Sequence, residues 1–367
     1  MASVPYLDLK PQFKALEKQI NERIQTVLNH GQFILGPEVE ECEKALATFI
    51  GSKHCLTAAS GTDALMMALM ALGVGHGDEV ITTPFSFFAT AEVISLLGAE
   101  PVFVDIEAET FNLDPSKIEA AITPKTKAIM PVSLYGQPAD FDAINAIAIK
   151  HNLPVVEDAA QSFGAAYRGK KSCGLTTVSA TSFFPAKPLG AYGDGGAVFT
   201  NDSELNQKMA MIRVHGQESR YHHTMMGING RLDTLQCAIL IEKLKRYDWE
   251  IQRRNEIASR YSESLQALGE KCIIPKILSD RGSVWAQYTV RVKDRATFGA
   301  KLKEQGVPTS IHYPSPLHHQ PVYSYLRHKF NLPVADKVAF EVISLPMWPD
   351  MSMDQVDQVV KAVKAAF

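Results

Sequence analysis

The chain has 367 residues, of which 46% are hydrophobic and 21% are charged, and its formal net charge is −3. A chain of this length favours two domains over a single small one. The charge balance lacks the basic excess of nucleic-acid-binding proteins, and no run of like charges indicates a disordered tail. The composition therefore argues against nucleic acid as a partner and indicates a globular protein.

The N-terminal segment, MASVPYLDLKPQ, lacks the charged and then apolar pattern of a signal peptide, and the apolar runs are too short to span a bilayer. Five cysteines show neither a CxxC pair nor a metal-ligand spacing, which is typical of reduced thiols. They stand at positions 42, 55, 173, 237 and 272. We therefore expect a cytoplasmic protein without membrane contact.

Two segments with helical periodicity come first, at residues 11–29 and 38–50. Short apolar runs then alternate with amphipathic stretches. The apolar runs are DEVITT, PVFVD, KAIMPVSL and LPVVED, and the amphipathic stretches are GTDALMMALMALG, ATAEVISLLGA and DAINAIAIKHN. Because the strands are apolar on both faces, this alternation predicts a mainly parallel sheet covered by helices. Such sheets bind ligands at the carboxyl ends of their strands.

From about residue 247 the character of the chain changes. A long charged helix, DWEIQRRNEIASRYSESLQAL, leads into the strand pattern AQYTVRV, the helix RATFGAKLKEQ and a final helix after MSMDQ. This order predicts a smaller α+β domain. We therefore divide the chain into a large domain, residues 1–246, and a small C-terminal domain, residues 247–367.

The stretch SFFPAKPLGAYGDGGAVFTN, residues 182–201, places one lysine in a rigid frame. Pro185 and Pro188 restrict the backbone on either side of Lys187. The glycines at positions 190, 193, 195 and 196 permit tight turns and close approach by another group. A surface turn between the strands ATSFF and GAVFT explains this stretch equally well, so the rest of the chain has to decide.

Two other stretches of the large domain offer ligand-binding groups. AASGTDALMMAL places Ser60, Gly61 and Thr62 in the first turn of a helix, where free N–H groups and hydroxyls suit a phosphate. A plain helix cap has the same pattern. TPFSFFAT contains Phe87, which can lie flat on a heteroaromatic ring or pack in the core. Neither stretch identifies a ligand by itself.

LPVVEDAAQS ends an apolar strand with Glu157 and Asp158, and Gln161 follows three residues later. An acid, an aromatic ring, a phosphate cup and Lys187 together describe a site for pyridoxal phosphate. Lysine forms a Schiff base with this cofactor, and a carboxylate beside the pyridine nitrogen keeps it protonated. A dinucleotide or a nucleoside triphosphate is the alternative. However, no GxGxxG follows the first strand, and GxxxxGK[ST] does not occur.

The chain resembles the sugar aminotransferases of the DegT/DnrJ/EryC1/StrS family over nearly its whole length. The resemblance rests on GQFILGPEVEECE, ASGTDAL, GDEVITTPFSFFATAEVI, DAAQSFGA, SFFPAKPLGAYGDGGAVFTN, GINGRLDTLQCAIL and HYPSPLH. It implies the aspartate aminotransferase fold, which is PLP-dependent transferase fold type I, an α/β fold with a mainly parallel seven-stranded sheet between helices. Within the family the chain is most similar to the enzymes that aminate C3 of a UDP-linked 3-keto-hexuronic acid in O-antigen sugar synthesis.

The resemblance also implies residue roles around the cofactor. Lys187 matches the Schiff-base lysine, and Asp158 matches the partner of the pyridine nitrogen. Gln161 corresponds to the residue near the ring's 3-hydroxyl, and Phe87 to the aromatic residue that stacks on the ring. Pyridoxal 5′-phosphate is then the cofactor, and pyridoxamine 5′-phosphate is the intermediate form between the two half-reactions, in which L-glutamate is the amino donor and becomes 2-oxoglutarate.

The phosphate of the cofactor is expected to bind between two chains. Gly61, Thr62 and Ser182 match the phosphate cup, and Asn229 matches the residue that reaches the same phosphate from the neighbouring subunit. The resemblance therefore implies a homodimer with shared active sites. A nucleotide-linked keto sugar is the second substrate.

For that sugar we expect a carboxylate that is recognised by Arg231, with help from His312 and Tyr313. Arginine's planar fork suits a carboxylate, although Arg231 could equally be a helix residue with a structural ion pair. Phe33 is also assigned to substrate binding. The alternatives are a 4-keto or a neutral 3-keto sugar linked to UDP or dTDP. A non-catalytic regulator with the same fold is a further alternative, but it should have lost Lys187 or its cofactor partners.

Two adjacent histidine pairs stand at residues 222–223 and 318–319. The sequence near them shows no cluster of carboxylates and histidines at metal-ligand spacing. We therefore expect surface or substrate-channel roles for these histidines, and no metal site.

Overall fold

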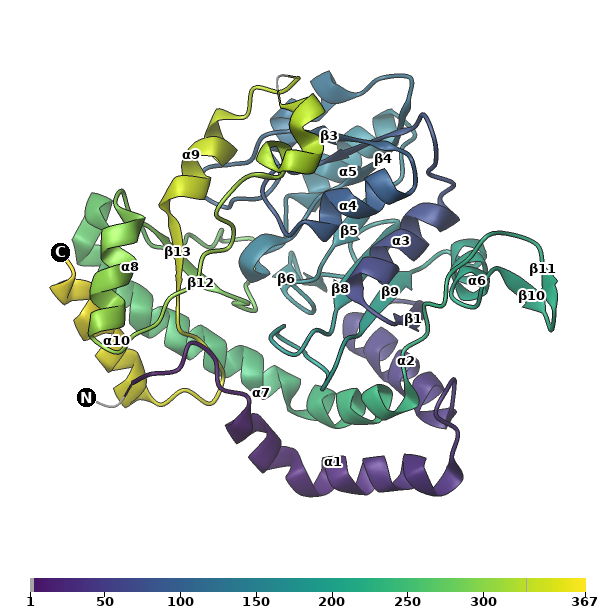
Figure 1. Cartoon of the computed structure of the whole chain (residues 1–367), viewed down its shortest axis with the longest axis horizontal. Coiled ribbons are helices and arrows are strands. Elements are labelled where there is room, and N and C mark those ends of the chain that lie inside the picture. The colour runs from purple at the N-terminus through teal and green to yellow at the C-terminus, as the bar shows by residue number, and fades with distance from the viewer. Residues whose placement is uncertain (1–2, 328) are drawn as a thin grey trace.

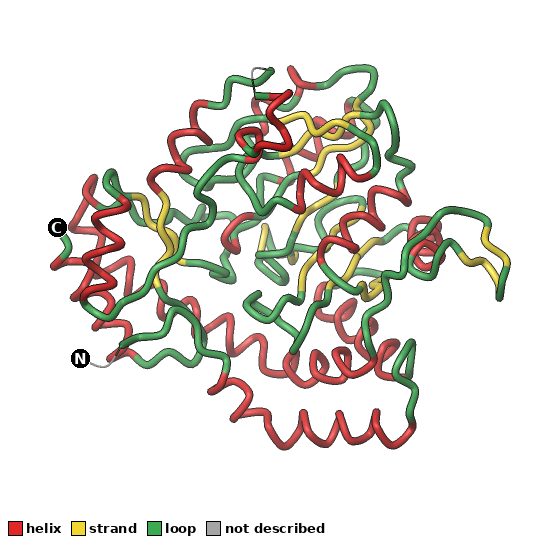
Figure 2. Tube along the Cα trace, in the orientation of Figure 1, coloured by secondary structure: helices red, strands yellow, loops and turns green. Residues whose placement is uncertain are grey.

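The structure of the protein, a computed structural model, describes residues 3–327 and 329–367. A larger part contains a sheet with helices around it, and a smaller part lies beside both chain termini (Figure 1). Figure 2 shows the same division, with most of the strands inside the larger part and two strands among the helices of the smaller part. The predicted two-part organisation of an α/β chain is therefore present.

The α-helices of the described chain range in length from 8 residues (α4) to 32 residues (α7). Their bounds are α1 (Lys10–His30), α2 (Pro37–Ile50), α3 (Gly61–Ala71), α4 (Ala89–Leu96), α5 (Phe141–Lys150), α6 (Ser203–Ile212), α7 (Thr234–Leu265), α8 (Arg295–Glu304), α9 (Pro333–Glu341) and α10 (Met353–Ala365). The segments predicted at residues 11–29 and 38–50 are α1 and α2. Glycines in the left-handed conformation, Gly31 and Gly51, end these two helices.

The strands are short. Their bounds are β1 (His54–Ala58), β2 (Glu79–Thr82), β3 (Glu100–Phe103), β4 (Thr126–Met130), β5 (Val156–Asp158), β6 (Ala166–Tyr167), β7 (Lys170–Lys171), β8 (Val178–Ser182), β9 (Gly196–Thr200), β10 (Gln217–Ser219), β11 (His222–His223), β12 (Tyr288–Arg291) and β13 (Val342–Leu345). Each apolar run that the sequence marked as a strand overlaps one of them.

Seven strands of the described chain form the sheet of the large domain, in the order β1-β9-β8-β5-β4-β2-β3. Parallel bridges from Ile129 to Val155 and from Val132 to Asp158 join β4 to β5. β9 runs antiparallel to its two neighbours, and the other pairings between neighbours are parallel. The mainly parallel seven-stranded sheet is thus confirmed.

Helices cover both faces of this sheet, as its apolar strands require. On one face α3, α4 and α6 pack against the strands around Val80, Val156 and Val198. On the other face α2, α5 and α7 cover the strands around Ile129 and Phe199. Because both faces are covered, ligands reach the sheet at its edge, where the strands end.

The helix α7 has 32 residues and runs from the large part of the molecule into the small part (Figure 1). The charged helix that the sequence marked from residue 248 is therefore the second half of a longer one. The division of the chain at residues 246 and 247 falls inside this helix and stays a prediction.

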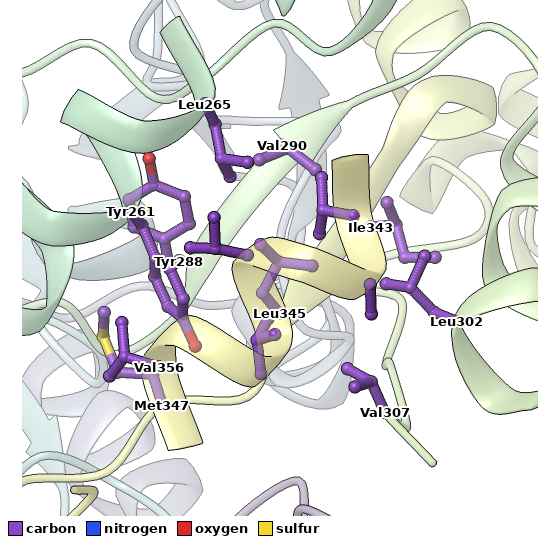
Figure 3. Close-up of a cluster of buried hydrophobic side chains, with 14 of the residues drawn as sticks. Tyr261, Leu265, Tyr288, Val290, Leu302, Val307, Ile343, Leu345, Met347 and Val356 are labelled. Atoms are coloured by element: carbon purple, nitrogen blue, oxygen red, sulfur yellow. The ribbon is translucent and has the colours of Figure 1, made fainter. Parts of the chain in front are cut away.

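The small domain has an apolar core between α7, α8, α10 and the antiparallel pair β12–β13. Figure 3 shows Tyr261, Tyr288 and Leu345 around the helix α10. Val4 is buried in the same core, and its amide donates a hydrogen bond of 3.0 Å to the Gly306 carbonyl oxygen. The N-terminal segment is therefore attached to the small domain rather than to the large one.

The five cysteines are free, as the sequence indicated, and all five are buried. Among the described residues, no helix combines the length and apolar character that crossing a lipid bilayer requires.

Candidate active site

A cavity of about 530 Å³ opens where the sheet strands β4, β5 and β8 end. Nine of the residues that we expected at the site line it. They are Gly61, Thr62, Phe87, Asp158, Gln161, Ser182, Lys187, His312 and Tyr313. These residues come from both parts of the molecule, because His312 and Tyr313 follow the small-domain helix α8. The convergence of strand ends that the sequence predicted is confirmed for this set.

Lys187 lies in a loop that is held closed by backbone hydrogen bonds within the loop. The Lys187 amide donates to the Phe184 carbonyl oxygen at 2.8 Å, and the Ala191 amide donates to the Phe183 carbonyl oxygen at 2.7 Å. A Cβ atom on Gly190 would lie 2.5 Å from the Pro185 carbonyl oxygen, so this position excludes any side chain. The loop therefore keeps the lysine at the cavity.

Asp158 and Glu157 are neighbours at the end of β5, and the strand sends them to opposite faces. Asp158 lines the cavity, where its carboxylate accepts hydrogen bonds from the Thr90 hydroxyl at 2.8 Å and the Ala160 amide at 3.1 Å. Glu157 is buried away from it, and its carboxylate accepts hydrogen bonds from Ser133 and Ser172. Asp158 is thus the acid available to a ligand.

Burial and charge act in opposite directions on the two ionisable groups of the cavity. Burial raises the pKa of Asp158, while the hydrogen bonds it accepts and the charge of Lys187 lower it. Burial also lowers the pKa of Lys187, and the charge of Asp158 raises it. Each group thus favours the charged form of the other.

The start of α3 forms a cradle for an anion. Ser60 caps the helix by accepting the Asp63 amide at 3.0 Å, which leaves the N–H groups of Gly61 and Thr62 at the helix N-terminus. A Cβ atom on Gly61 would lie 2.7 Å from the Ser182 Cβ atom, and one on Gly196 would lie 2.4 Å from the Ser60 carbonyl oxygen. Both glycines are therefore required for this close packing.

A hydrogen-bond network fixes the opposite wall of the cavity. The Gln161 side chain accepts the Tyr135 amide at 2.7 Å and donates to the Tyr313 hydroxyl at 3.0 Å. The Tyr135 hydroxyl donates to the His312 carbonyl oxygen. Burial, together with the charge of Lys187, lowers the pKa of His312 to about 4, so its ring is neutral at physiological pH. Phe87 is 56% exposed, and its ring centroid lies 6.2 Å from that of Tyr313.

Phe33, Asn229 and Arg231 lie apart from this cavity. Asn229 and Arg231 line a second hollow of about 310 Å³, and Asp194 lines both. Phe33 is close to that hollow, because its carbonyl oxygen accepts the Thr234 amide at 3.0 Å. Within the described chain, the buried Arg231 Nε has no hydrogen-bond partner. These three residues therefore do not surround Lys187 of their own chain.

Three polar residues in or beside the cavity that bear on its function were not identified from the sequence. Thr90 bonds to Asp158, Gln287 lines the cavity from the small domain, and Asp194 connects it to the second hollow. The buried Oε1 atom of Gln287 has no hydrogen-bond partner in the described chain. The four-residue spacing of Ser86 and Thr90 was the available signal for Thr90, because Ser86 lies just before α4 and the two hydroxyls are 2.9 Å apart.

The expectation that no carboxylate accompanies the histidines at 318–319 was wrong. Asp336 Oδ1 lies 3.2 Å from His318 Nε2 and 3.4 Å from His319 Nε2. The carboxylate is 17 residues further along the chain and is brought to the histidines by α9, which no local spacing reveals. The other pair, His222 and His223, is exposed on the β10–β11 hairpin that projects from the molecule (Figure 1).

The residues of the cavity fit pyridoxal phosphate. Lys187 suits its aldehyde, and the carboxylate of Asp158 suits its pyridine nitrogen. The cradle at Gly61, which a single Cβ atom would fill, suits its phosphate. This fold and these residues define a PLP-dependent aminotransferase.

The sequence pattern of the DegT/DnrJ/EryC1/StrS aminotransferase family matches residues 14–364, and the chain belongs to this family. It is 55% identical over 360 residues to the UDP-2-acetamido-2-deoxy-3-oxo-D-glucuronate aminotransferase of Pseudomonas aeruginosa, covering 98% of this chain and 99% of that one. It is 48% identical over 363 residues to a protein of Geobacillus stearothermophilus named "Pleiotropic regulatory protein", covering 98% of each.

Among solved structures, the fold is similar to that of DesV from S. venezuelae in complex with a ketimine intermediate. The TM-score is 0.97 at 40% sequence identity, and the alignment covers 100% of this chain and 99% of that one. The resemblance that the motifs indicated is therefore confirmed over the whole length of the chain.

Proposed function

We propose that this enzyme transfers the amino group of L-glutamate to the C3 keto group of a UDP-2-acetamido-3-keto-hexuronic acid. The main support for an aminotransfer reaction is that Lys187 and Asp158 line the same cavity as the anion cradle. The sugar follows from the 55% identical relative, whose name states a UDP-linked 3-oxo-glucuronate. The amino sugar would enter O-antigen or lipopolysaccharide synthesis.

Bound pyridoxal phosphate supplies a carbonyl carbon for the amino group and a ring that accepts electrons. Lys187 Nζ would take a proton from the substrate carbon that bears the nitrogen and pass it to C4′ of the cofactor within the same half-reaction. In the second half-reaction it would carry a proton in the opposite direction. Its lowered pKa favours the neutral amine that this role requires. The carboxylate of Asp158 keeps a proton at the pyridine nitrogen. Phe87 and Tyr313 restrict the access of water from the open side.

We infer that each active site is built from two chains of a homodimer. Phe33, Asn229 and Arg231 gather at a hollow separate from the Lys187 cavity, where they can face a partner's cavity. Exposed apolar side chains support such an interface, because Phe33, Ile34 and Leu35 are each at least 44% exposed in one chain. Asn229 would then reach the partner's cofactor phosphate.

Arg231 would bind the carboxylate of the uronate, with help from His312 and Tyr313 of the partner subunit's cavity wall. The buried Nε of this guanidinium has no hydrogen-bond partner among the described residues, which supports the role because a structural contact would otherwise be expected there. L-Glutamate would use the same arginine in the other half-reaction, since it also presents a carboxylate.

Two other functions remain as alternatives. A 4-keto or a neutral 3-keto sugar on UDP or dTDP would use the same cofactor site. A regulatory role has support in the name of the 48% identical relative, but the complete set around Lys187 favours catalysis. We also propose a cytoplasmic location, because five free, buried cysteines are typical of reducing compartments.

Incubation with glutamate and a panel of keto sugars tests the proposal. The panel contains the UDP-3-keto-uronate, its neutral 3-keto-hexose counterpart and UDP- and dTDP-linked 4-keto sugars, with products identified by mass spectrometry. Amination of the uronate at C3, with release of 2-oxoglutarate, is expected. Preferred amination of a 4-keto sugar would replace the proposed substrate, and a lack of product from every sugar would favour the regulatory role.

A further inference from the structure

His318, His319 and Asp336 form a compact cluster outside the active-site cavity. His318 and His319 belong to a short turn, Leu317–His319, and Asp336 lies in the first turns of α9. The ligand atoms of the three side chains all lie within 4.8 Å of one another. Among the described residues, no other group of three histidine, cysteine or acidic side chains converges in this way.

Two buried atoms of the cluster lack a hydrogen-bond partner in the described part of the chain. They are Asp336 Oδ1 and His318 Nδ1. Asp336 Oδ1 nevertheless lies 3.2 Å from His318 Nε2 and 3.4 Å from His319 Nε2. The three groups thus approach one another closely, and a buried polar atom without a partner, such as His318 Nδ1, calls for an explanation.

The spacing suits a metal ion. Ligand atoms that lie about 2.0–2.1 Å from a tetrahedral zinc ion are about 3.3–3.4 Å from one another. The separations between Asp336 Oδ1 and the histidine nitrogens, 3.2 and 3.4 Å, match this edge. Imidazole nitrogen and carboxylate oxygen are also ligands that zinc commonly takes.

We propose that His318, His319 and Asp336 bind one zinc(II) ion, with water as the fourth ligand. The side chains of His319 and Asp336 are 28% and 38% exposed, so water and the ion can reach the site from the surface. His318, whose side chain is 2% exposed, forms its buried side.

The surroundings carry further charge. Asp105 is buried next to the start of α9, where its carboxylate accepts the amides of Val334 and Ala335 at 3.1 and 2.9 Å. Lys117 lies 3.6 Å from Asp105 and balances part of that charge. The carboxylates of Asp105 and Asp336 outnumber the ammonium group of Lys117. The local charge therefore favours a bound cation.

Zinc at this site would join two segments that are separate in sequence. One is the turn that follows Tyr313, and the other is α9. The Leu317 amide donates to the Pro84 carbonyl oxygen at 2.7 Å, so the turn also contacts the loop that carries Phe87. The ion would thus hold two walls of the cavity in place. This inference does not depend on the proposed substrate.

Equilibrium competition between the tag-free holoenzyme and a chromophoric zinc chelator tests the site. One zinc ion per chain is expected for the wild type. His319→Ala and Asp336→Ala should lose at least 100-fold in zinc affinity, because each removes one of three protein ligands. His151→Ala is the matched control, since His151 pairs with a single carboxylate, Glu119, at 2.8 Å on the surface. It should bind zinc as the wild type does.

Two further measurements separate loss of binding from loss of folding. Zinc should raise the melting temperature of the wild type and of His151→Ala, and should leave that of His319→Ala unchanged. A zinc-soaked crystal, measured on both sides of the zinc absorption edge, should show an anomalous peak between the three side chains. Equal zinc affinity in the wild type and in folded His319→Ala and Asp336→Ala, or an anomalous peak elsewhere alone, would overturn the proposal.

Discussion

The Thr90 hydroxyl donates a hydrogen bond of 2.8 Å to the Asp158 carboxylate, and both groups are buried beside the cavity. Thr90 comes from α4 and Asp158 from the end of β5, so the bond links a helix to the centre of the sheet. It lowers the pKa of an acid that burial raises. The ionised form of Asp158, which suits a protonated pyridine nitrogen, therefore depends on Thr90.

Thr90→Val should weaken turnover and move the acidic limb of the pH–rate profile to higher pH. The valine keeps the shape but removes one of the two donors to the carboxylate and leaves only the Ala160 amide, so the pKa of Asp158 rises further. Activity that needs the carboxylate is present above its pKa and is lost as pH falls through it. Hydrogen bonds to charged groups contribute about 1.5–3 kcal/mol, so kcat should fall about 10- to 100-fold.

The control for this substitution is Thr82→Val. Thr82 is also buried in the sheet, but its hydroxyl donates to the Met130 carbonyl oxygen at 2.7 Å. Its loss should lower the melting temperature and leave the pH–rate profile in place. An unshifted acidic limb in Thr90→Val would show that the hydroxyl does not tune Asp158.

Gly61→Ala should lower the affinity for pyridoxal phosphate at least 10-fold. The added Cβ atom would lie 2.7 Å from the Ser182 Cβ atom, so the helix start has to move away from the strand. Overpacking of this kind costs about 1–3 kcal/mol. Gly75→Ala is the control, because a Cβ atom there meets nothing within 4 Å. Absorbance titration would give the dissociation constant of the cofactor for each variant. Equal values for Gly61→Ala and Gly75→Ala would exclude the proposed cradle.

Lys187→Ala should abolish turnover, and borohydride should no longer fix the cofactor to the chain. Lys187 lines the cavity and carries the amine that the aldehyde requires. Lys171→Ala provides a comparison, since burial also lowers the pKa of that lysine outside the cavity. Peptide mapping by mass spectrometry would locate the label in the wild type. Label on a lysine other than Lys187 contradicts the assignment.

The sequence predicted the fold and the centre of the site because both depend on local patterns. Asp158 and Lys187 each follow an apolar run, and parallel strands bring their carboxyl ends together whatever the details of packing. The cradle at Gly61 was recognisable because a helix cap and its first turn are contiguous in sequence. The sequence alone was therefore enough to identify these positions.

Other relationships could not be predicted, since they arise from long-range packing. Gln287 reaches the cavity from the small domain, and Asp336 meets His318 through the position of α9. No periodicity or spacing connects these pairs. Asn229 lies in a second hollow of its own chain, so its assignment to a partner's site rests on the family resemblance and requires an experiment.

Mixing inactive Lys187→Ala with inactive Asn229→Ala protein provides that experiment. If the partner's Asn229 completes each site, every mixed dimer contains one site with both native residues. Activity should then recover toward about one quarter of the wild-type value, by random pairing of sites. Subunit exchange has to be shown by native mass spectrometry. Proven exchange without recovered activity would count against a shared site.

The identity of the sugar depends on Arg231, whose Nε is buried and has no hydrogen-bond partner within the described chain. If this guanidinium binds the carboxylate of a uronate, its loss removes a charge-assisted pair worth about 1.5–3 kcal/mol. Arg231→Ala should therefore raise the KM for the 3-keto-uronate about 10- to 100-fold. The KM for the neutral 3-keto-hexose should change little, because that sugar presents no carboxylate.

Arg231→Lys distinguishes charge from shape, since lysine keeps the positive charge but not the planar fork. We expect it to recover only part of the uronate preference. The glutamate half-reaction, followed alone by absorbance, should weaken in Arg231→Ala if both substrates use this group in turn. The decisive measurement is kcat/KM for the uronate and for the neutral sugar in all three proteins. Equal efficiency on both sugars, unchanged by Arg231→Ala, would remove the basis for a uronate substrate, because the arginine would then contribute nothing that depends on the carboxylate.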